Sequence, residues 1–129
     1  MKRFLPLIII LLSILLIIVS CGNSENTFEL ALITNYDILD DSSFNYGAWE
    51  GLKKYAEENN KTYHYYKPEE GTKAAYLKAI ELAVKNGAKL VVAPGSVFEV
   101  TIYEAQVKYP EVNFILLDGE PHTEDYKTY

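Results

Sequence analysis

The chain has 129 residues, of which 12 are basic and 18 acidic, so its formal net charge is −6 at neutral pH. This acidic balance argues against nucleic acid as a partner, because nucleic-acid-binding proteins present basic patches to the phosphate backbone. The single cysteine excludes an intrachain disulfide and any zinc or iron–sulfur site built from several thiolates.

The first twenty residues have the pattern of an export signal. Lys2 and Arg3 precede an almost unbroken apolar run from Phe4 to Val19, which is shorter than the roughly twenty residues that a transmembrane helix needs. The run ends in Ile18-Val19-Ser20-Cys21, which resembles the lipobox of bacterial lipoproteins. We therefore expect residues 1–20 to be removed and Cys21 to anchor the protein, through two acyl chains, at the outer face of the cell membrane. The alternative is an uncleaved membrane anchor with an incidental cysteine.

The residues after the expected cleavage site form a tether and one domain. Residues 21–27 are polar and lack the apolar side chains of a packed core. Loss of residues 1–20 removes two basic residues and no acidic one, which leaves a net charge of −8. Such a charge favours attachment through the lipid rather than through a polybasic surface. The remaining length suits one domain and is too short for two.

Strand-like and helix-like segments alternate along this domain. Short apolar or β-branched runs predict four strands, at residues 28–34, 62–66, 90–93 and 113–117. Apolar positions spaced by three and four predict three helices between them: one capped by Ser42 or Ser43 and ending at Asn59, one over 72–86, and one over about 97–109. Residues 120–129 form a polar tail without clear periodicity.

This βαβαβαβ order predicts an α/β fold with a doubly wound parallel sheet, because the crossovers are long enough for parallel pairing. Such sheets bind ligands beyond the carboxyl ends of their strands, where the strand order reverses. Polar or glycine-containing segments are expected at that edge at residues 35–45, 94–96 and 118–119.

Each candidate residue at that edge has two interpretations. Asp40 and Asp41 either provide acid–base or metal chemistry or favour the start of the following helix through its dipole. Phe44 is either a core residue or an aromatic lid over a ligand. Asn45 offers a donor and an acceptor, or is an ordinary surface residue. Asp118 is either a hydroxyl-binding carboxylate or a turn residue in Asp-Gly.

The sequence shows no convincing catalytic or metal-binding set. His64 and His122 are far apart and lack a ligand pattern around them. A small enzyme that uses Asp40, Asp41 and Asp118 is the weaker hypothesis, and a binding module without a cofactor is the stronger one.

Several stretches together resemble one known family. Residues 35–52, NYDILDDSSFNYGAWEGL, resemble the signature of the basic membrane protein family. Its members are substrate-binding lipoproteins of ABC transporters, similar to purine nucleoside receptors. Residues 87–95, 109–114 and 117–119 agree with the family in order and spacing.

The resemblance implies a lobe of the periplasmic-binding-protein type I fold and assigns roles to four residues. The family's aromatic at Phe44 stacks on a purine, Asn45 hydrogen-bonds the ligand, and the carboxylate at Asp118 contacts ribose. Family members usually have Asp at the position of Asn35, so a neutral amide here replaces a charged hydroxyl acceptor. We expect residues 28–119 to be the N-terminal solute-binding lobe, with the second lobe missing and an ABC transporter permease as partner. The alternative is a truncated surface lipoprotein without a ligand.

Overall fold

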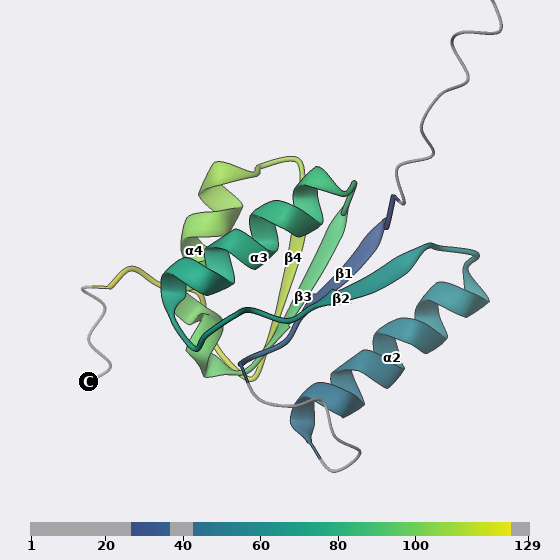
Figure 1. The fold of residues 1–129 in the computed structure, drawn as a ribbon, viewed down its shortest axis with the longest axis horizontal. Coiled ribbons are helices and arrows are strands. Elements are labelled where there is room, and N and C mark those ends of the chain that lie inside the picture. The colour runs from purple at the N-terminus through teal and green to yellow at the C-terminus, as the bar shows by residue number, and fades with distance from the viewer. Residues whose placement is uncertain (1–26, 37–42, 125–129) are drawn as a thin grey trace, which may run out of the picture.

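A computed structural model describes residues 27–36 and 43–124 of the chain (Figure 1). The predicted export signal, Cys21, Asp40 and Asp41 lie outside these residues, so their assigned roles remain predictions. Among the helices that the structure describes, none is long and apolar enough to cross a bilayer.

The described chain alternates strands and helices in the predicted order. The strands are β1 (Leu30–Ile33), β2 (Tyr63–Tyr66), β3 (Leu90–Pro94) and β4 (Asn113–Leu117). The helices are α2 (Phe44–Glu58), α3 (Lys73–Lys85), the short 3-10 helix η1 (Ser96–Phe98) and α4 (Glu99–Lys108).

Most predicted bounds agree with the structure to within one residue, and two elements differ more. The first strand begins at Leu30 rather than at residue 28, because the Phe28 N–H donates to the carbonyl of Asn86 (2.9 Å) and not to a neighbouring strand. The predicted third helix is divided into η1 and α4. Gly95 has a φ of 110°, and its carbonyl accepts from the Phe98 N–H, so the chain makes a tight turn before α4 begins.

The four strands form one parallel sheet in the order β2-β1-β3-β4, which confirms the predicted fold class (Figure 1). The chain moves from β1 outward to β2, crosses back to β3, and continues outward to β4. The strand order therefore reverses between β1 and β3, and the carboxyl ends of these adjacent strands define the switch point. The chain enters the sheet at the opposite, amino edge.

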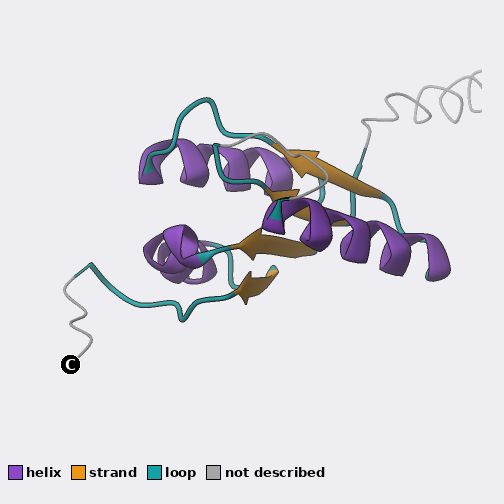
Figure 2. Ribbon diagram, turned by 90° about the horizontal axis from the view of Figure 1, so that it is seen from below, coloured by secondary structure: helices purple, strands orange, loops and turns teal. Residues whose placement is uncertain are grey.

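Helices pack on both faces of the sheet, as Figure 2 shows. On one face, Leu52 and Ala56 of α2 cover Leu30, Leu32 and Val92. The other face has the larger core, in which α3 and α4 cover alternate residues of β1 and β3. Each large aliphatic side chain buried in these layers contributes about 1.5–3 kcal/mol relative to its exposed state. Burial of both faces explains why β3 reads as a continuous apolar run.

The α2 face of the sheet is only partly covered. A groove of about 580 Å³ lies between α2 and β4, and its lining includes Gly47, Gly51, Leu90 and Ile115. An added Cβ at either glycine would meet no atom within 4 Å. This part of the sheet, next to the outer strand β4, therefore presents apolar side chains to solvent.

Candidate functional site

The predicted ligand-binding residues lie at the carboxyl edge of the sheet. Asn35 is the second residue after β1, next to Thr34, and Asp118 is the first residue after β4. Phe44 and Asn45 form the first turn of α2, which begins at the same edge. The topology therefore places all four residues around one edge, which includes the switch point.

The start of α2 is fixed by Ser43, one of the two caps that the sequence allowed. The Ser43 hydroxyl oxygen accepts a hydrogen bond from the Tyr46 N–H (3.1 Å). A cap of this type satisfies an amide that has no partner within the helix. The cap holds Phe44 and Asn45 at the first two helical positions, where their side chains differ sharply in exposure.

Phe44 is 58% exposed, so the interpretation of Phe44 as a core residue is wrong. Tyr36, after β1, and Val97, after β3, are also large apolar side chains that remain exposed. Burial of apolar surface is the main favourable term in association. An exposed phenylalanine at the switch point is therefore available to stack on a flat ligand.

Asn45 is buried, with 4% exposure, and is not an ordinary surface residue. Its Nδ2 donates to Oδ1 of Asn35 at 2.7 Å, a bond that joins the start of α2 to the end of β1. Oδ1 of Asn45 and the hydroxyl oxygen of buried Thr34 have no hydrogen-bond partner in the described structure. The site thus has a polar floor with unused hydrogen-bonding capacity.

Asp118 lies in the left-handed backbone region, with a φ of 58°, and its side chain is exposed. Aspartate tolerates this conformation better than most residues do. The backbone of Asp118 therefore agrees with a residue that reverses the chain, and its exposed side chain is accessible to a ligand. β3 lies between β1 and β4, so two strand spacings, about 10 Å, separate Asp118 from the end of β1. Asn35, after β1, and Asp118, after β4, are thus placed to contact opposite ends of one ligand.

Two further residues at this edge were not predicted as site residues. Glu99, in the first turn of α4, accepts a hydrogen bond from the Glu120 N–H (3.1 Å) and contacts Nε2 of His122 (3.0 Å). The Glu120 amide and the His122 ring hold the pKa of the Glu99 carboxyl below its ordinary value. The Thr123 carbonyl and the Glu99 carboxylate raise the pKa of His122. No periodicity in the sequence signals this pairing across 23 residues.

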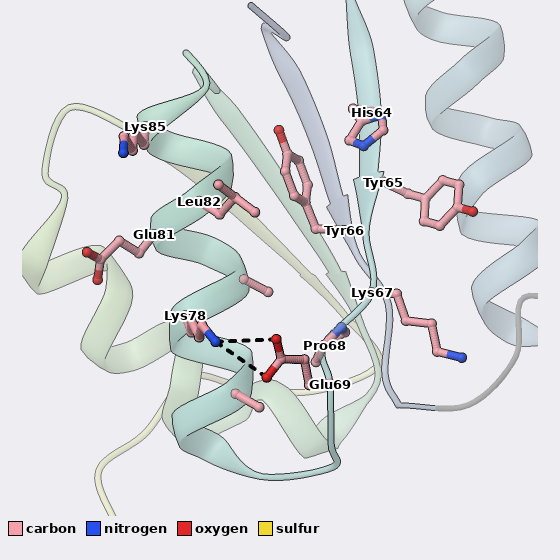
Figure 3. Close-up of a pocket in the computed structure, with 12 residues that line it drawn as sticks. His64, Tyr65, Tyr66, Lys67, Pro68, Glu69, Lys78, Glu81, Leu82 and Lys85 are labelled. Atoms are coloured by element: carbon pink, nitrogen blue, oxygen red, sulfur yellow. Dashed lines mark hydrogen bonds and ion pairs between the residues drawn. The ribbon is translucent and has the colours of Figure 1, made fainter. Parts of the chain in front are cut away.

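A second groove, of about 430 Å³, lies between β2 and α3 (Figure 3). Tyr66 and Leu82 point into it, and Lys78 pairs with Glu69 at 3.4 Å. It contains none of the predicted ligand-binding residues. Among the described residues, no group of three or more His, Cys, Asp or Glu side chains could hold a metal ion.

A parallel α/β lobe with polar side chains gathered at its switch point is the architecture of a ligand-binding lobe. The sequence profile of the Bmp family, described as ABC transporter substrate-binding protein PnrA-like, matches residues 28–126. The chain therefore belongs to this family of ABC transporter substrate-binding proteins.

Named relatives agree with this assignment. The chain is similar to the CD4+ T-cell-stimulating antigen of Listeria monocytogenes, with 30% identity over 98 residues, which cover 74% of this chain and 28% of the relative. It is also similar to the ABC transporter nucleoside-binding protein BmpA of Lactococcus lactis, with 28% identity over 102 residues, which cover 76% and 28%. The chain thus spans less than a third of the length of these relatives.

A solved structure supports the fold. The crystal structure of a transcriptional activator of the comK gene from Bacillus halodurans superposes with a TM-score of 0.59 at 23% identity. The match covers 72% of this chain and 31% of that chain.

Proposed function

We propose that this chain is the N-terminal solute-binding lobe of a lipid-anchored, extracytoplasmic component of an ABC importer, and that its solute is a purine nucleoside. The observation that carries the proposal is the exposed ring of Phe44 beside the Asn35–Asn45 pair at the switch point. The name of the lactococcal relative, a nucleoside-binding protein, supports this class of solute. Binding and release, rather than catalysis, is the activity expected of the lobe.

In the proposed complex, the purine lies on the ring of Phe44 and the ribose is directed toward Asp118. Purines present a flat π-surface that stacks on aromatic side chains, and ribose hydroxyls donate to a carboxylate. Asn35 and Asn45 lie at the other end of the site, where their amides suit the polar edge of a base or a sugar hydroxyl. Because Asn35 is neutral where family members usually have Asp, this site carries one negative charge fewer than theirs. Asp118 is then the principal hydroxyl acceptor.

The expected affinity of the lobe alone is low. Stacking on one aromatic contributes about 1–3 kcal/mol, and each net hydrogen bond contributes about 1 kcal/mol. The ordering cost of association offsets much of this sum, which leaves a dissociation constant of about 1 mM. The second lobe of a two-lobed receptor would bury the opposite face of the ligand and tighten binding by orders of magnitude.

The test is a titration of the chain with guanosine, inosine, adenosine and free ribose, followed by ligand-observed NMR because binding is weak. Phe44→Ala and Asp118→Ala are expected to abolish measurable nucleoside binding. Tyr55→Ala is the matched control, because Tyr55 is another exposed aromatic of α2, with 53% exposure, but lies three turns from the site. It should bind as the wild type does.

Two results would overturn the nucleoside assignment. One is the absence of binding by both this chain and a version completed with the second lobe of a relative. The other is unchanged binding in both site variants. Either result would favour the alternative, a surface lipoprotein without a solute.

A further inference from the structure

The segment that follows β4 is folded around one side chain, Glu99. One carboxylate oxygen of Glu99, Oε1, accepts from the Glu120 N–H at 3.1 Å, and the other, Oε2, contacts Nε2 of His122 at 3.0 Å. Glu99 and His122 are both largely covered, with side-chain exposures of 27% and 20%. A single carboxylate on α4 thus holds two successive parts of the segment.

The turn at Asp118 and Gly119 is shaped to admit this carboxylate. A Cβ built on Gly119 would lie 3.0 Å from Oε1 of Glu99 and 3.2 Å from Cδ2 of Leu116, closer than side chains normally pack. The absence of a side chain at Gly119 therefore lets Glu99 reach the backbone of the turn. The residue before it, Asp118, has the left-handed backbone conformation that such a turn requires.

The contacts of His122 select its charged form. Nδ1 lies 2.7 Å from the carbonyl oxygen of Thr123, and Nε2 lies 3.0 Å from the carboxylate of Glu99. Both partners are acceptors, so both ring nitrogens must carry a proton to make both bonds. A neutral imidazole has only one N–H, so when Glu99 is ionised only the imidazolium makes both bonds.

We infer that Glu99 is a positioning residue for Asp118 and that the Glu99–His122 pair makes the ligand-binding edge sensitive to pH. The inference extends the proposed function, in which Asp118 contacts the ligand. Glu99 acts on Asp118 through the backbone of Gly119 and Glu120 and does not itself touch the solute. When His122 is charged, the turn at Asp118 and Gly119 is held against α4. The backbone of Asp118, from which its carboxylate extends, then has a fixed position at the carboxyl edge.

The charges around His122 act in the same direction. Glu99 of α4 and Glu120 of its own segment both favour the imidazolium. Farther along, Lys73 of α3 pairs with Glu124 and, at 2.8 Å, with Glu104 of α4. Lys73 thus gives the segment a second ionic contact with the helices, at Glu124.

The sign of the pH effect follows from the two shifts. The pKa of His122 is raised, so its contribution is complete below the ordinary histidine value near 6.5 and is lost as pH rises through the raised value. The pKa of Glu99 is lowered, so its contribution is present above the ordinary glutamate value and is lost as pH falls through the lowered value. Asp118 is therefore held best at mildly acidic pH.

The experiment follows the full 129-residue chain in detergent by NMR, from about pH 5 to about pH 8.5. The His122 ring and the Gly119 and Glu120 amides should titrate together, with a midpoint above 6.5. Glu99→Gln keeps an acceptor for the Glu120 amide but offers an NH2 group to a neutral His122. It should move the pKa of His122 back toward 6.5 and uncouple the amides from it. Lys73→Met, which removes the neighbouring ion pairs, is the control and should leave the coupling in place.

Inosine binding, measured over the same pH range, tests the effect on the site. In the wild type, affinity should fall several-fold as His122 loses its proton, whereas Glu99→Gln should give a flat profile and Glu99→Ala weak binding at every pH. A titration of His122 that Glu99→Gln leaves unchanged would overturn the inference. Coupled NMR titrations with inosine binding that does not vary with pH would overturn the link to Asp118. Coupled titrations with no nucleoside binding at any pH would leave the pairing intact and refute the proposed solute instead.

Discussion

Replacement of Thr34 by valine is expected to stabilise this protein. Thr34 follows β1 and is 1% exposed, and its hydroxyl oxygen has no hydrogen-bond partner in the described structure. Valine has the same branched shape and the same preference for extended backbone. The backbone bond from the Thr34 N–H to the Tyr66 carbonyl (3.0 Å) does not depend on the side chain. The substitution therefore removes a buried polar group and little else.

The size of the effect follows from the cost of that group. A buried donor or acceptor without a partner costs about 1–3 kcal/mol, and a methyl group in its place adds favourable apolar burial. We take about 1 kcal/mol as the expected gain, at the lower end of this range. For a domain of this size, such a gain raises the melting temperature by about 4–8 °C.

Thermal and urea unfolding, monitored by circular dichroism, would measure this gain. The matched control is Val91→Thr in the adjacent strand β3, where Val91 is fully buried. It introduces the same hydroxyl into an apolar layer and should lower stability by about 1–3 kcal/mol. A Thr34→Val protein that melts below the wild type would refute the reasoning, because it would show that the hydroxyl has a stabilising partner.

Three further predictions concern the support of the site and the anchor. Phe98→Ala should cost about 3–5 kcal/mol in urea unfolding, because Phe98 is fully buried and contacts Tyr76 (ring centroids 4.6 Å apart); a loss under 1 kcal/mol would contradict the packing described. Ser43→Ala should cost about 1 kcal/mol by loss of the cap of α2, whereas Ser43→Asn should not. Cys21→Ala should abolish partition into detergent and the diacylglyceryl mass; an acylated variant would disprove the lipobox assignment.

β1, β3 and β4 were predictable because each is a short, mostly apolar run closed by polar or turn residues, and β2 because its tyrosines favour extended backbone. Residues 113–117 were predicted with the observed bounds. β3 was predicted from a continuous apolar run, the pattern of a strand that is buried on both faces. The division of the third helix was not predictable from periodicity, because the apolar spacing continues through Val97 and Phe98. The bond from the Phe98 N–H to the Gly95 carbonyl spans three residues and makes the first turn a 3-10 turn, which apolar spacing does not show.

The site was predictable only where its residues are close in sequence or belong to a motif. Phe44 and Asn45 stand next to each other, but which of the two is buried depends on how the first turn of α2 lies against the end of β1. The Asn35–Asn45 bond spans a loop of ten residues and remains within one motif. The Glu99–His122 contact joins a helix to a segment without periodicity, so it depends on the tertiary fold alone.

The chain enters the sheet at the amino edge, whereas the proposed ligand site lies at the carboxyl edge. In a protein acylated at Cys21, the six Cα-to-Cα steps from Cys21 to Thr27 can span at most about 20 Å. The loops that precede β2, β3 and β4 would then lie nearest the lipid headgroups, and the mouth of the site would open toward the surrounding medium. Capture of a solute therefore suits the anchored orientation. If the proposed permease lies in the same membrane, delivery would require the lobe to rotate about this short tether.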